Sequence, residues 1–283
     1  MEPRFERPAS VAQATRLLAA RPWAVLAGGT DLYPAHVGRT IALPLLDIGG
    51  IAELRGIRSD GAGWTIGATT TWSDVARADL PPLFAALRSA AREVGGVQIQ
   101  NTGTVAGNLC NASPAADGTP VLLAMGARVV LQSARGAREL AVDEFVLGNR
   151  RTARGDDELV VAVRIPARSA RARSAFAKLG GRRYLTIAVT TVAVVVDADA
   201  GGTVCAAGVA VGSCAPAARR LPALEARLVG APSEGDLAAL VADGDLAALA
   251  PIDDVRGSAA YRIDATRTLV RRALGEVSAS IRR

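Results

Sequence analysis

Residues 25–32 read Val25-Leu26-Ala27-Gly28-Gly29-Thr30-Asp31-Leu32. A short apolar strand, expected over residues 24–26, runs into two glycines and a hydroxyl. Glycine adopts positive φ readily and lets a ligand approach the backbone closely, and successive amides in such a turn can form an anion site. A tight turn after a strand is the plain alternative. The stretch is neither a Walker A loop nor a Rossmann Gly-x-Gly-x-x-Gly loop, so a phosphate site here would be of another type.

A second stretch combines glycine with small polar side chains, and three of the chain's four asparagines fall within residues 101–111. We expect a polar loop over residues 95–111 and then a helix that starts at Ser113-Pro114 and runs to Met125, with proline at its first position. Asp117 would lie in the first turn of that helix. Such a segment beside a helix N-terminus suits a pyrophosphate, although a polar loop with a capped helix remains the plain alternative. The stretch reads Asn101-Thr102-Gly103-Thr104-Val105-Ala106-Gly107-Asn108-Leu109 and continues through Asn111.

The remaining pattern predicts an α+β protein in two parts. The first part, residues 1–170, divides into subdomains of about 1–55 and 56–170, and the second part spans residues 171–283. The boundary is expected near residues 167–172, within a basic linker from Arg164 to Arg173. Beyond it the sequence predicts two long strands over residues 185–197 and 203–212, followed by helices over 221–228, 235–249 and 259–274.

Composition excludes several classes of protein. Half of the residues are apolar, which is too many for a disordered chain, and no stretch approaches the roughly 20 apolar residues of a membrane span. The net charge is +6, but the cations are dispersed arginines with one lysine, Lys178, so nucleic acid is not expected as a partner. Three cysteines without Cys-x-x-Cys spacing and a charged first segment predict a cytoplasmic protein. The lone His36 has no second ligand spaced with it, so no metal site is expected.

Two separate anion loops suggest a dinucleotide held by a non-Rossmann cradle. With these loops in place, the chain resembles the FAD-binding (medium) subunit of the molybdenum hydroxylase family, the xanthine dehydrogenase and carbon monoxide dehydrogenase type. The resemblance runs nearly end to end. It includes Thr65-Ile66-Gly67-Ala68-Thr69-Thr70, Phe176-Ala177-Lys178-Leu179 through Arg182-Arg183, and the segment from Tyr261 to Leu274.

The resemblance implies a vanillyl-alcohol-oxidase-type (PCMH) fold, in which two α+β subdomains hold FAD and a small sheet-and-helix domain follows. The pyrophosphate and neighbouring groups would be held by residues Ala27 to Asp31 and Thr104 to Asn108. Asp117 would form a hydrogen bond with the ribityl or ring region, and Lys178 would lie near the isoalloxazine. No catalytic residue is expected, because the cofactor performs the redox chemistry. The implied cofactor-binding residues are Ala27, Gly28, Gly29, Thr30, Asp31, Leu32, Asn101, Thr104, Val105, Gly107, Asn108, Asp117 and Lys178.

The resemblance also implies function and partners. The chain would be an oxidoreductase subunit that accepts electrons from a [2Fe–2S] small subunit and passes them to NAD or another acceptor. A molybdopterin large subunit would complete the complex, as a dimer of heterotrimers. The alternatives are a self-contained FAD reductase of the UDP-N-acetylenolpyruvoylglucosamine reductase type, for which the second part lacks an acid–base cluster, and a scaffold that has lost flavin, against which both intact loops argue.

The chain departs from the family pattern at several positions. Ala106 stands where many relatives have a second glycine, which a negative φ would tolerate. Leu185 and Thr186 occupy positions that are acidic in xanthine dehydrogenases, and Ile187 stands where carbon monoxide dehydrogenase types carry an aromatic residue. The environment of the flavin ring therefore matches neither type.

Two further hypotheses concern the cations in the second half of the chain. A cation at the pyrimidine side of a flavin would stabilise negative charge on the reduced ring, so Lys178→Ala is expected to change the midpoint potential of bound FAD; a solvated surface lysine is the alternative. Residues 150–183 hold ten cations against three acids. This region could attract an anionic nucleotide or an acidic iron–sulfur partner, or could simply be solvated surface.

Overall fold

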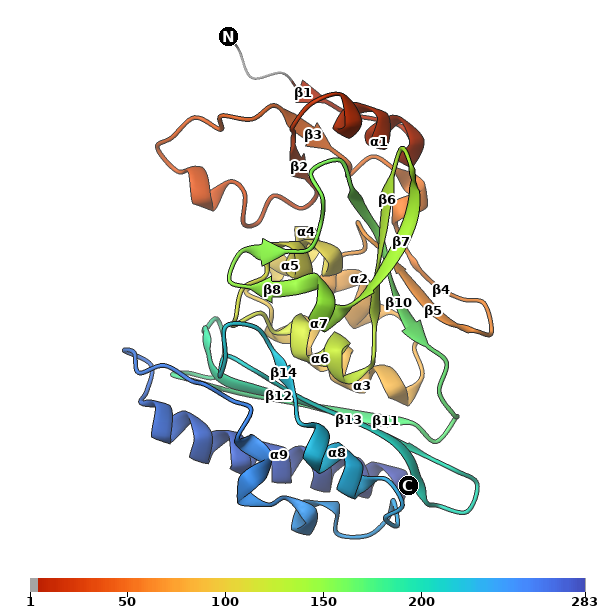
Figure 1. The fold of residues 1–283 in the computed structure, drawn as a ribbon, viewed down its shortest axis with the longest axis vertical. Coiled ribbons are helices and arrows are strands. Elements are labelled where there is room, and N and C mark those ends of the chain that lie inside the picture. The colour runs from red at the N-terminus through yellow and green to blue at the C-terminus, as the bar shows by residue number, and fades with distance from the viewer. Residues whose placement is uncertain (1–4, 283) are drawn as a thin grey trace.

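The computed structural model describes residues 5–282, and three sheets follow one another along its long axis (Figure 1). The first is a parallel sheet of order β1-β3-β2, made of Phe5–Glu6, Leu45–Asp47 and Ala24–Leu26. Helix α1 (Val11–Ala20) lies beside it in Figure 1, and Ser10 caps this helix by accepting a hydrogen bond from the amide of Gln13. The strand expected to lead into the glycines is therefore present.

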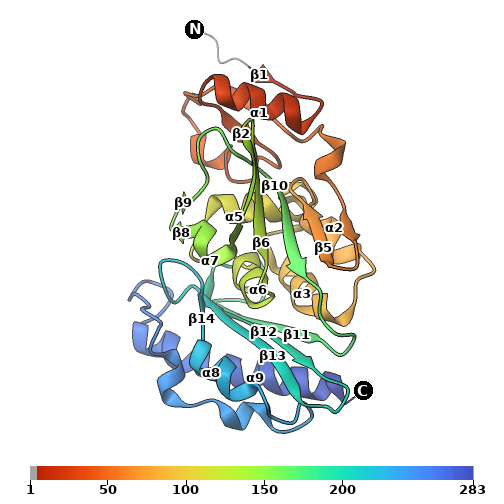
Figure 2. The ribbon, with the colours of Figure 1, turned by 45° about the vertical axis from the view of Figure 1, so that its right-hand side comes forward.

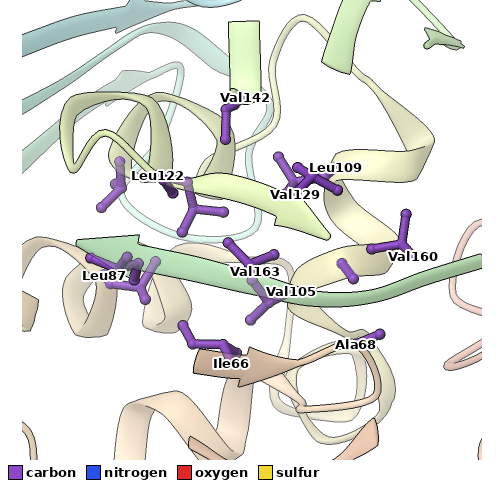
Figure 3. Close-up of a cluster of buried hydrophobic side chains, with 14 of the residues drawn as sticks. Ile66, Ala68, Leu87, Val105, Leu109, Leu122, Val129, Val142, Val160 and Val163 are labelled. Atoms are coloured by element: carbon purple, nitrogen blue, oxygen red, sulfur yellow. The ribbon is translucent and has the colours of Figure 1, made fainter. Parts of the chain in front are cut away.

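The central sheet is antiparallel, of order β4-β5-β10-β6-β7. Figure 3 shows its apolar side chains, among them Ile66, Val129 and Val163, meeting Leu87 and Leu122 from the helices, and all five are fully buried. Val105 and Leu109 of the second glycine stretch belong to this core. The strands are β4 (Ile57–Ser59), β5 (Gly63–Gly67), β6 (Arg128–Ser133), β7 (Gly136–Ala141) and β10 (Leu159–Pro166), with a hairpin of β8 (Val146–Gly148) and β9 (Arg151–Thr152). The helices are α2 (Trp72–Arg77), α3 (Ala85–Glu93), α4 (Val97–Thr102), α5 (Val105–Asn111), α6 (Gly118–Ala124) and α7 (Val142–Phe145).

The third sheet is antiparallel, of order β11-β12-β13-β14, and it is covered on both faces (Figures 1 and 2). One face packs on α3 and α6 and the other on α8 and α9. In β12, Val192 and Val194 join the core toward α9, whereas Ala193 and Val195 join the central core. Burial on both faces explains why this strand is an almost continuous apolar run. The elements are β11 (Arg173–Gly180), β12 (Ala188–Ala198), β13 (Val204–Gly212), β14 (Arg219–Arg220), α8 (Pro222–Leu228) and α9 (Ala259–Ile281).

The α+β class is confirmed, but several expected element boundaries were wrong. Residues 95–111 are not a loop, because they form α4 and α5. Helix α6 starts at Gly118 rather than at Pro114, since the Ser113 hydroxyl accepts a hydrogen bond from the Ala115 amide and closes a local turn first. Asp117 is therefore the N-cap residue of α6 and lies before its first turn.

Two errors concern the second part of the chain. The helix expected over residues 235–249 is replaced by two 3-10 turns, in which the carboxylates of Asp236 and Asp245 accept backbone amide hydrogen bonds that compete with a helix. The expected linker is also shorter, because Arg164 belongs to β10 and Arg173 begins β11. Within residues 5–282, no helix is long and apolar enough to cross a membrane.

Gly275→Ala is expected to raise the free energy of unfolding by about 0.5–1 kcal/mol, because glycine inside a helix is disfavoured by about that amount relative to alanine. Gly275 is exposed in the interior of α9, and a Cβ there would meet nothing within 4 Å. Urea unfolding followed by circular dichroism measures the change. A urea midpoint that stays constant or falls would contradict the open, helical position of Gly275 in α9.

Candidate cofactor site

A cavity of about 490 Å³ lies between the N-terminal sheet and the central part of the chain, which is a volume typical of ligand pockets. Three segments that are distant in sequence form its walls. The first predicted stretch contributes residues 27–32, and the second contributes Thr104, Gly107, Asn108 and Asn111. The third wall comes from the β8–β9 hairpin and the segment after it, including Arg150, Thr152 and Arg154.

The first wall is a glycine turn with free amides. Gly29 has φ +68°, which glycine adopts without strain. In the part of the chain that the structure describes, no oxygen accepts a hydrogen bond from the amides of Gly28, Gly29 or Thr30. Gly28 also packs directly on the other stretch, because a Cβ at this position would lie 1.9 Å from the carbonyl oxygen of Thr102. The two stretches are thus in contact, and their junction requires glycine.

The second wall is helix α5. Its N-cap Thr104 accepts a hydrogen bond from the Gly107 amide through its side chain, 3.0 Å from oxygen to nitrogen. Asn108 and Asn111 both line the cavity, three positions apart and therefore on one side of the helix. The side-chain oxygen of each is buried and has no partner among the described residues. Buried polar atoms are normally hydrogen-bonded, so these two oxygens indicate a place for a polar ligand or water.

Four of the thirteen predicted residues do not line this cavity. Asn101 is exposed, and its side-chain oxygen accepts a hydrogen bond from the Ser73 hydroxyl. Val105 is fully buried in the core beneath α5. Asp117 and Lys178 lie together at the seam between the central helices and the third sheet.

Asp117 and Lys178 form a buried ion pair with 2.8 Å between Lys178 Nζ and Asp117 Oδ2, and their side chains are 10% and 6% exposed. Lys178 Nζ also donates to the carbonyl of Glu93. Burial raises the pKa of Asp117 to about 6, and the nearby Lys178 opposes this shift. The expected alternative of a solvated lysine is therefore wrong. Lys178 borders a second cavity of about 460 Å³, whose other lining residues include Phe176, Arg182 and Thr186.

Arg150 is one of the cavity-lining residues that sequence reasoning did not single out. It carries a side chain that pairs with Asp31 across the mouth, with Nη1 and Nη2 at 2.8 and 3.2 Å from the two carboxylate oxygens. The sequence analysis includes Arg150 only as one of the ten cations in residues 150–183. A positive φ and a contact with a residue 119 positions away determine its place, and neither leaves a local signal.

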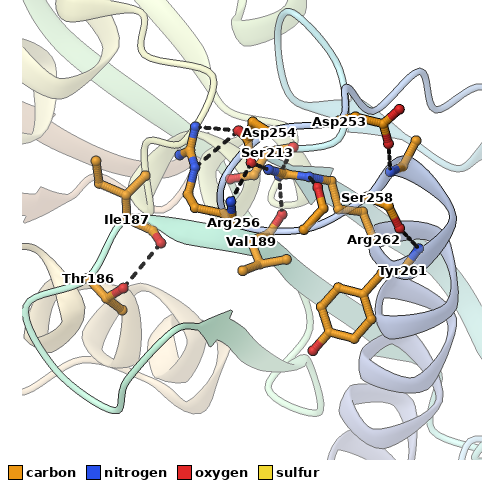
Figure 4. A network of polar contacts seen from close by, with 12 residues as sticks. Thr186, Ile187, Val189, Ser213, Asp253, Asp254, Arg256, Ser258, Tyr261 and Arg262 are labelled. Carbon is orange, nitrogen blue, oxygen red and sulfur yellow. Dashed lines mark hydrogen bonds and ion pairs between the residues drawn. The ribbon is translucent and has the colours of Figure 1, made fainter.

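A buried arginine of α9, Arg262, is the centre of a network of polar contacts (Figure 4). Arg262 of α9 is 2% exposed, and its Nη1 donates to the carbonyls of Val189 and Ser213. Its Nη2 pairs with Asp254 at 2.6 Å. Ser213 has φ +65°, and its amide donates to the carbonyl of Pro114. The network therefore connects α9 to the turn just before Asp117. Among residues 5–282, no group of three or more histidines, cysteines and acids could hold a metal ion.

Comparison with known proteins covers both parts of the chain. Residues 1–168 match the family described as the FAD binding domain in molybdopterin dehydrogenase, and residues 174–277 match the CO dehydrogenase flavoprotein C-terminal domain. The carbon monoxide dehydrogenase medium chain of Hydrogenophaga pseudoflava is 34% identical, over 96% of each chain. The xanthine dehydrogenase FAD-binding subunit of Escherichia coli O157:H7 is 29% identical, over 98% of this chain and 96% of that one.

Solved structures agree. A chain of carbon monoxide dehydrogenase from Hydrogenophaga pseudoflava that lacks the Mo-pyranopterin moiety superposes with a TM-score of 0.87 at 33% identity, over 99% of both chains. A chain of the Cu,Mo-CO dehydrogenase also gives 0.87, at 30% identity over 98% of this chain and 97% of that one. The fold is thus that of these flavoprotein chains, and the expected resemblance is confirmed. The chain is a member of the FAD-binding subunits of the molybdenum hydroxylase family, and hence an oxidoreductase subunit.

Proposed function

We propose that this chain carries FAD as the electron-transfer subunit of a heterotrimeric molybdenum-containing dehydrogenase. In this role it accepts electrons from a [2Fe–2S] subunit and passes them to NAD or another acceptor. The observation that carries the proposal is the cavity itself, which is lined by residues 28–30 with their free amides and by the polar residues Asn108 and Asn111. Membership of the family supports FAD as the ligand of this cavity.

The residues of the cavity fit a flavin dinucleotide. The free amides of Gly28, Gly29 and Thr30 are donors suited to a diphosphate, and the side-chain amides of Asn108 and Asn111 supply further hydrogen-bonding groups at the cavity wall. Trp72 and Ile99 supply apolar wall. FAD, when bound, supplies the redox chemistry; this chain binds it, orients it and limits its contact with water. We keep all thirteen predicted residues in the proposal, with Asp117 and Lys178 toward the flavin ring and Asn101 and Val105 supporting the second wall.

The partners and the organisation of the chain belong to the same proposal. A small iron–sulfur subunit and a large molybdopterin subunit would complete a dimer of heterotrimers in the cytoplasm. The division into residues 1–170 and 171–283 remains our assignment. The alternative of a self-contained reductase has no observation in its favour, since both matched families describe molybdenum-enzyme flavoproteins.

Titration of the flavin-free chain with FAD tests the proposal. We expect one FAD per chain, a visible absorbance band and quenched flavin fluorescence. Asn108→Ala should raise the Kd for FAD about tenfold, since it removes a hydrogen-bonding group from the cavity. Asn149→Ala is the matched control, because Asn149 is exposed and does not line the cavity. A wild-type chain that binds no FAD would overturn the proposal.

Electron transfer needs a second measurement with the partner subunits. The chain should co-purify with the iron–sulfur and molybdopterin subunits when the three are produced together. Bound flavin should then be reduced when a substrate of the molybdenum subunit is added, and the turnover with NAD compared with dyes identifies the acceptor. Flavin that stays oxidised in an otherwise active complex would contradict the assigned role.

A further inference from the structure

The mouth of the cavity is crossed by one close pair of opposite charges. Asp31 follows directly after the free amides of residues 28–30, and Arg150 approaches it from the turn between β8 and β9. Both residues line the cavity, and the guanidinium bonds both carboxylate oxygens. The bidentate geometry fixes the orientation of the two groups, although the Arg150 and Asp31 side chains are 59% and 43% exposed.

The backbone around Arg150 fixes this contact. Arg150 has φ +53°, which is uncommon for a residue other than glycine. Its amide donates to the carbonyl of Ala112, 3.1 Å away, and Ala112 itself has φ +48° at the end of α5. Left-handed residues that are not glycine persist where the surrounding structure enforces them, and they concentrate at ligand sites. The arginine is therefore held toward the cavity mouth by the helix that carries Asn108 and Asn111.

The Arg150–Asp31 pair bears on the repulsion between Asp31 and the diphosphate that the proposed function places beside it. A diphosphate on the amides of residues 28–30 would carry negative charge next to the carboxylate of Asp31. The two negative charges would repel each other. The other acid of the cavity wall, Glu158, is already paired with Arg138 and accepts the Gly155 amide. Arg154, also in the wall, is bonded to the carbonyls of Gly155 and Glu158. Asp31 is thus the acid of the cavity wall whose counter-ion is Arg150.

We propose that Arg150 is a positioning residue of the dinucleotide site that acts through Asp31. Its guanidinium neutralises and orients the Asp31 carboxylate, so that an anionic diphosphate can bind on the adjacent amides. The assignment rests on the proposed function, and it predicts a specific dependence between the two side chains. Removal of Arg150 should be harmful only while residue 31 carries a charge.

The test measures the Kd of the flavin-free full chain for FAD, ADP and riboflavin. Arg150→Ala should raise the Kd for FAD and ADP about tenfold, as expected when a carboxylate next to an anionic group loses its counter-ion. The increase should be larger at low than at high salt. Riboflavin carries no phosphate, so its Kd should not change. The double variant Arg150→Ala/Asp31→Asn should return to within about twofold of wild type, and Arg150→Lys should recover part of the loss.

Each other outcome is informative. A double variant that stays as weak as Arg150→Ala would overturn the assignment, because Arg150 would then act directly or through the fold. An equal loss for riboflavin would overturn it for the same reason. Arg151→Ala is the control for the loss of a neighbouring cation that does not line the cavity. FAD binding that is indifferent to Arg150→Ala refutes only the role of Arg150, whereas a wild-type chain that binds neither FAD nor ADP refutes the proposed function as well.

Discussion

Lys178→Met is expected to lower the free energy of unfolding by about 3–5 kcal/mol at pH 7–8, because it leaves the Asp117 carboxylate buried without its counter-ion. The two side chains are almost completely enclosed. One oxygen of Asp117, Oδ1, already lacks a partner among the described residues, so no other group is available to take over from the lysine. Urea unfolding of wild type and variant at pH 7.5 measures the loss.

The loss should depend on pH in a direction that the Asp117 pKa fixes. That pKa is raised from 3.8 to about 6 in the folded protein, so the folded state retains a proton that the unfolded state has released between these values. The contribution of Asp117 to stability therefore falls as pH rises from about 4 to 6. Without Lys178 the pKa should rise further, so the deficit of Lys178→Met should be smaller at pH 5 than at pH 8.

Two further variants separate this explanation from a general packing defect. Lys178→Met/Asp117→Asn removes the charge that was left unpaired and should recover most of the stability. Arg135→Met breaks an ion pair with Asp157 in which the arginine side chain is 78% exposed, and it should cost at most about 1 kcal/mol. If the double variant were no more stable than Lys178→Met, the buried charge would not be the cause.

Gly28→Ala should weaken FAD binding by about tenfold to a hundredfold, and it should also destabilise the fold by about 1–3 kcal/mol. The added methyl would lie 1.9 Å from the carbonyl oxygen and 2.6 Å from the carbonyl carbon of Thr102. Both are backbone atoms, so the contact is relieved only when the turn at Gly28 and the end of α4 move apart. Fluorescence titration with FAD and urea unfolding measure the two effects.

Gly244→Ala provides the matched control, since a Cβ there would meet nothing within 4 Å and its backbone needs no positive φ. It should leave both FAD affinity and stability within error of wild type. Unchanged FAD affinity in Gly28→Ala would show that the two walls can separate without consequence, and that the contact between the stretches does not shape the site.

Local patterns allowed the two walls of the cavity to be predicted, because each lies in one continuous stretch. Glycine next to an apolar strand identified residues 28–30, and the density of asparagine and glycine identified Thr104 to Asn111. The start of α6 was placed too early, since the hydroxyl of Ser113 closes a turn that the proline signal did not reveal. The family resemblance assigned Asp117 and Lys178 separately to the flavin, but their pairing depends on how the third sheet packs on α6.

The same limit explains why Arg150 was missed. Its contact with Asp31 spans 119 positions, and its left-handed backbone depends on a hydrogen bond to the end of α5. No periodicity or motif records either feature. Such residues become visible only when distant segments are placed together.

The covered third sheet has a consequence for how the two matched families are joined. Its inner face, through Ala193, Val195 and Ala210, belongs to the same hydrophobic cluster as the central sheet. The boundary between the two matched families therefore crosses a continuous hydrophobic core. Neither part should keep its solubility if the other were cut away, because each would expose the apolar surface that now lies between them.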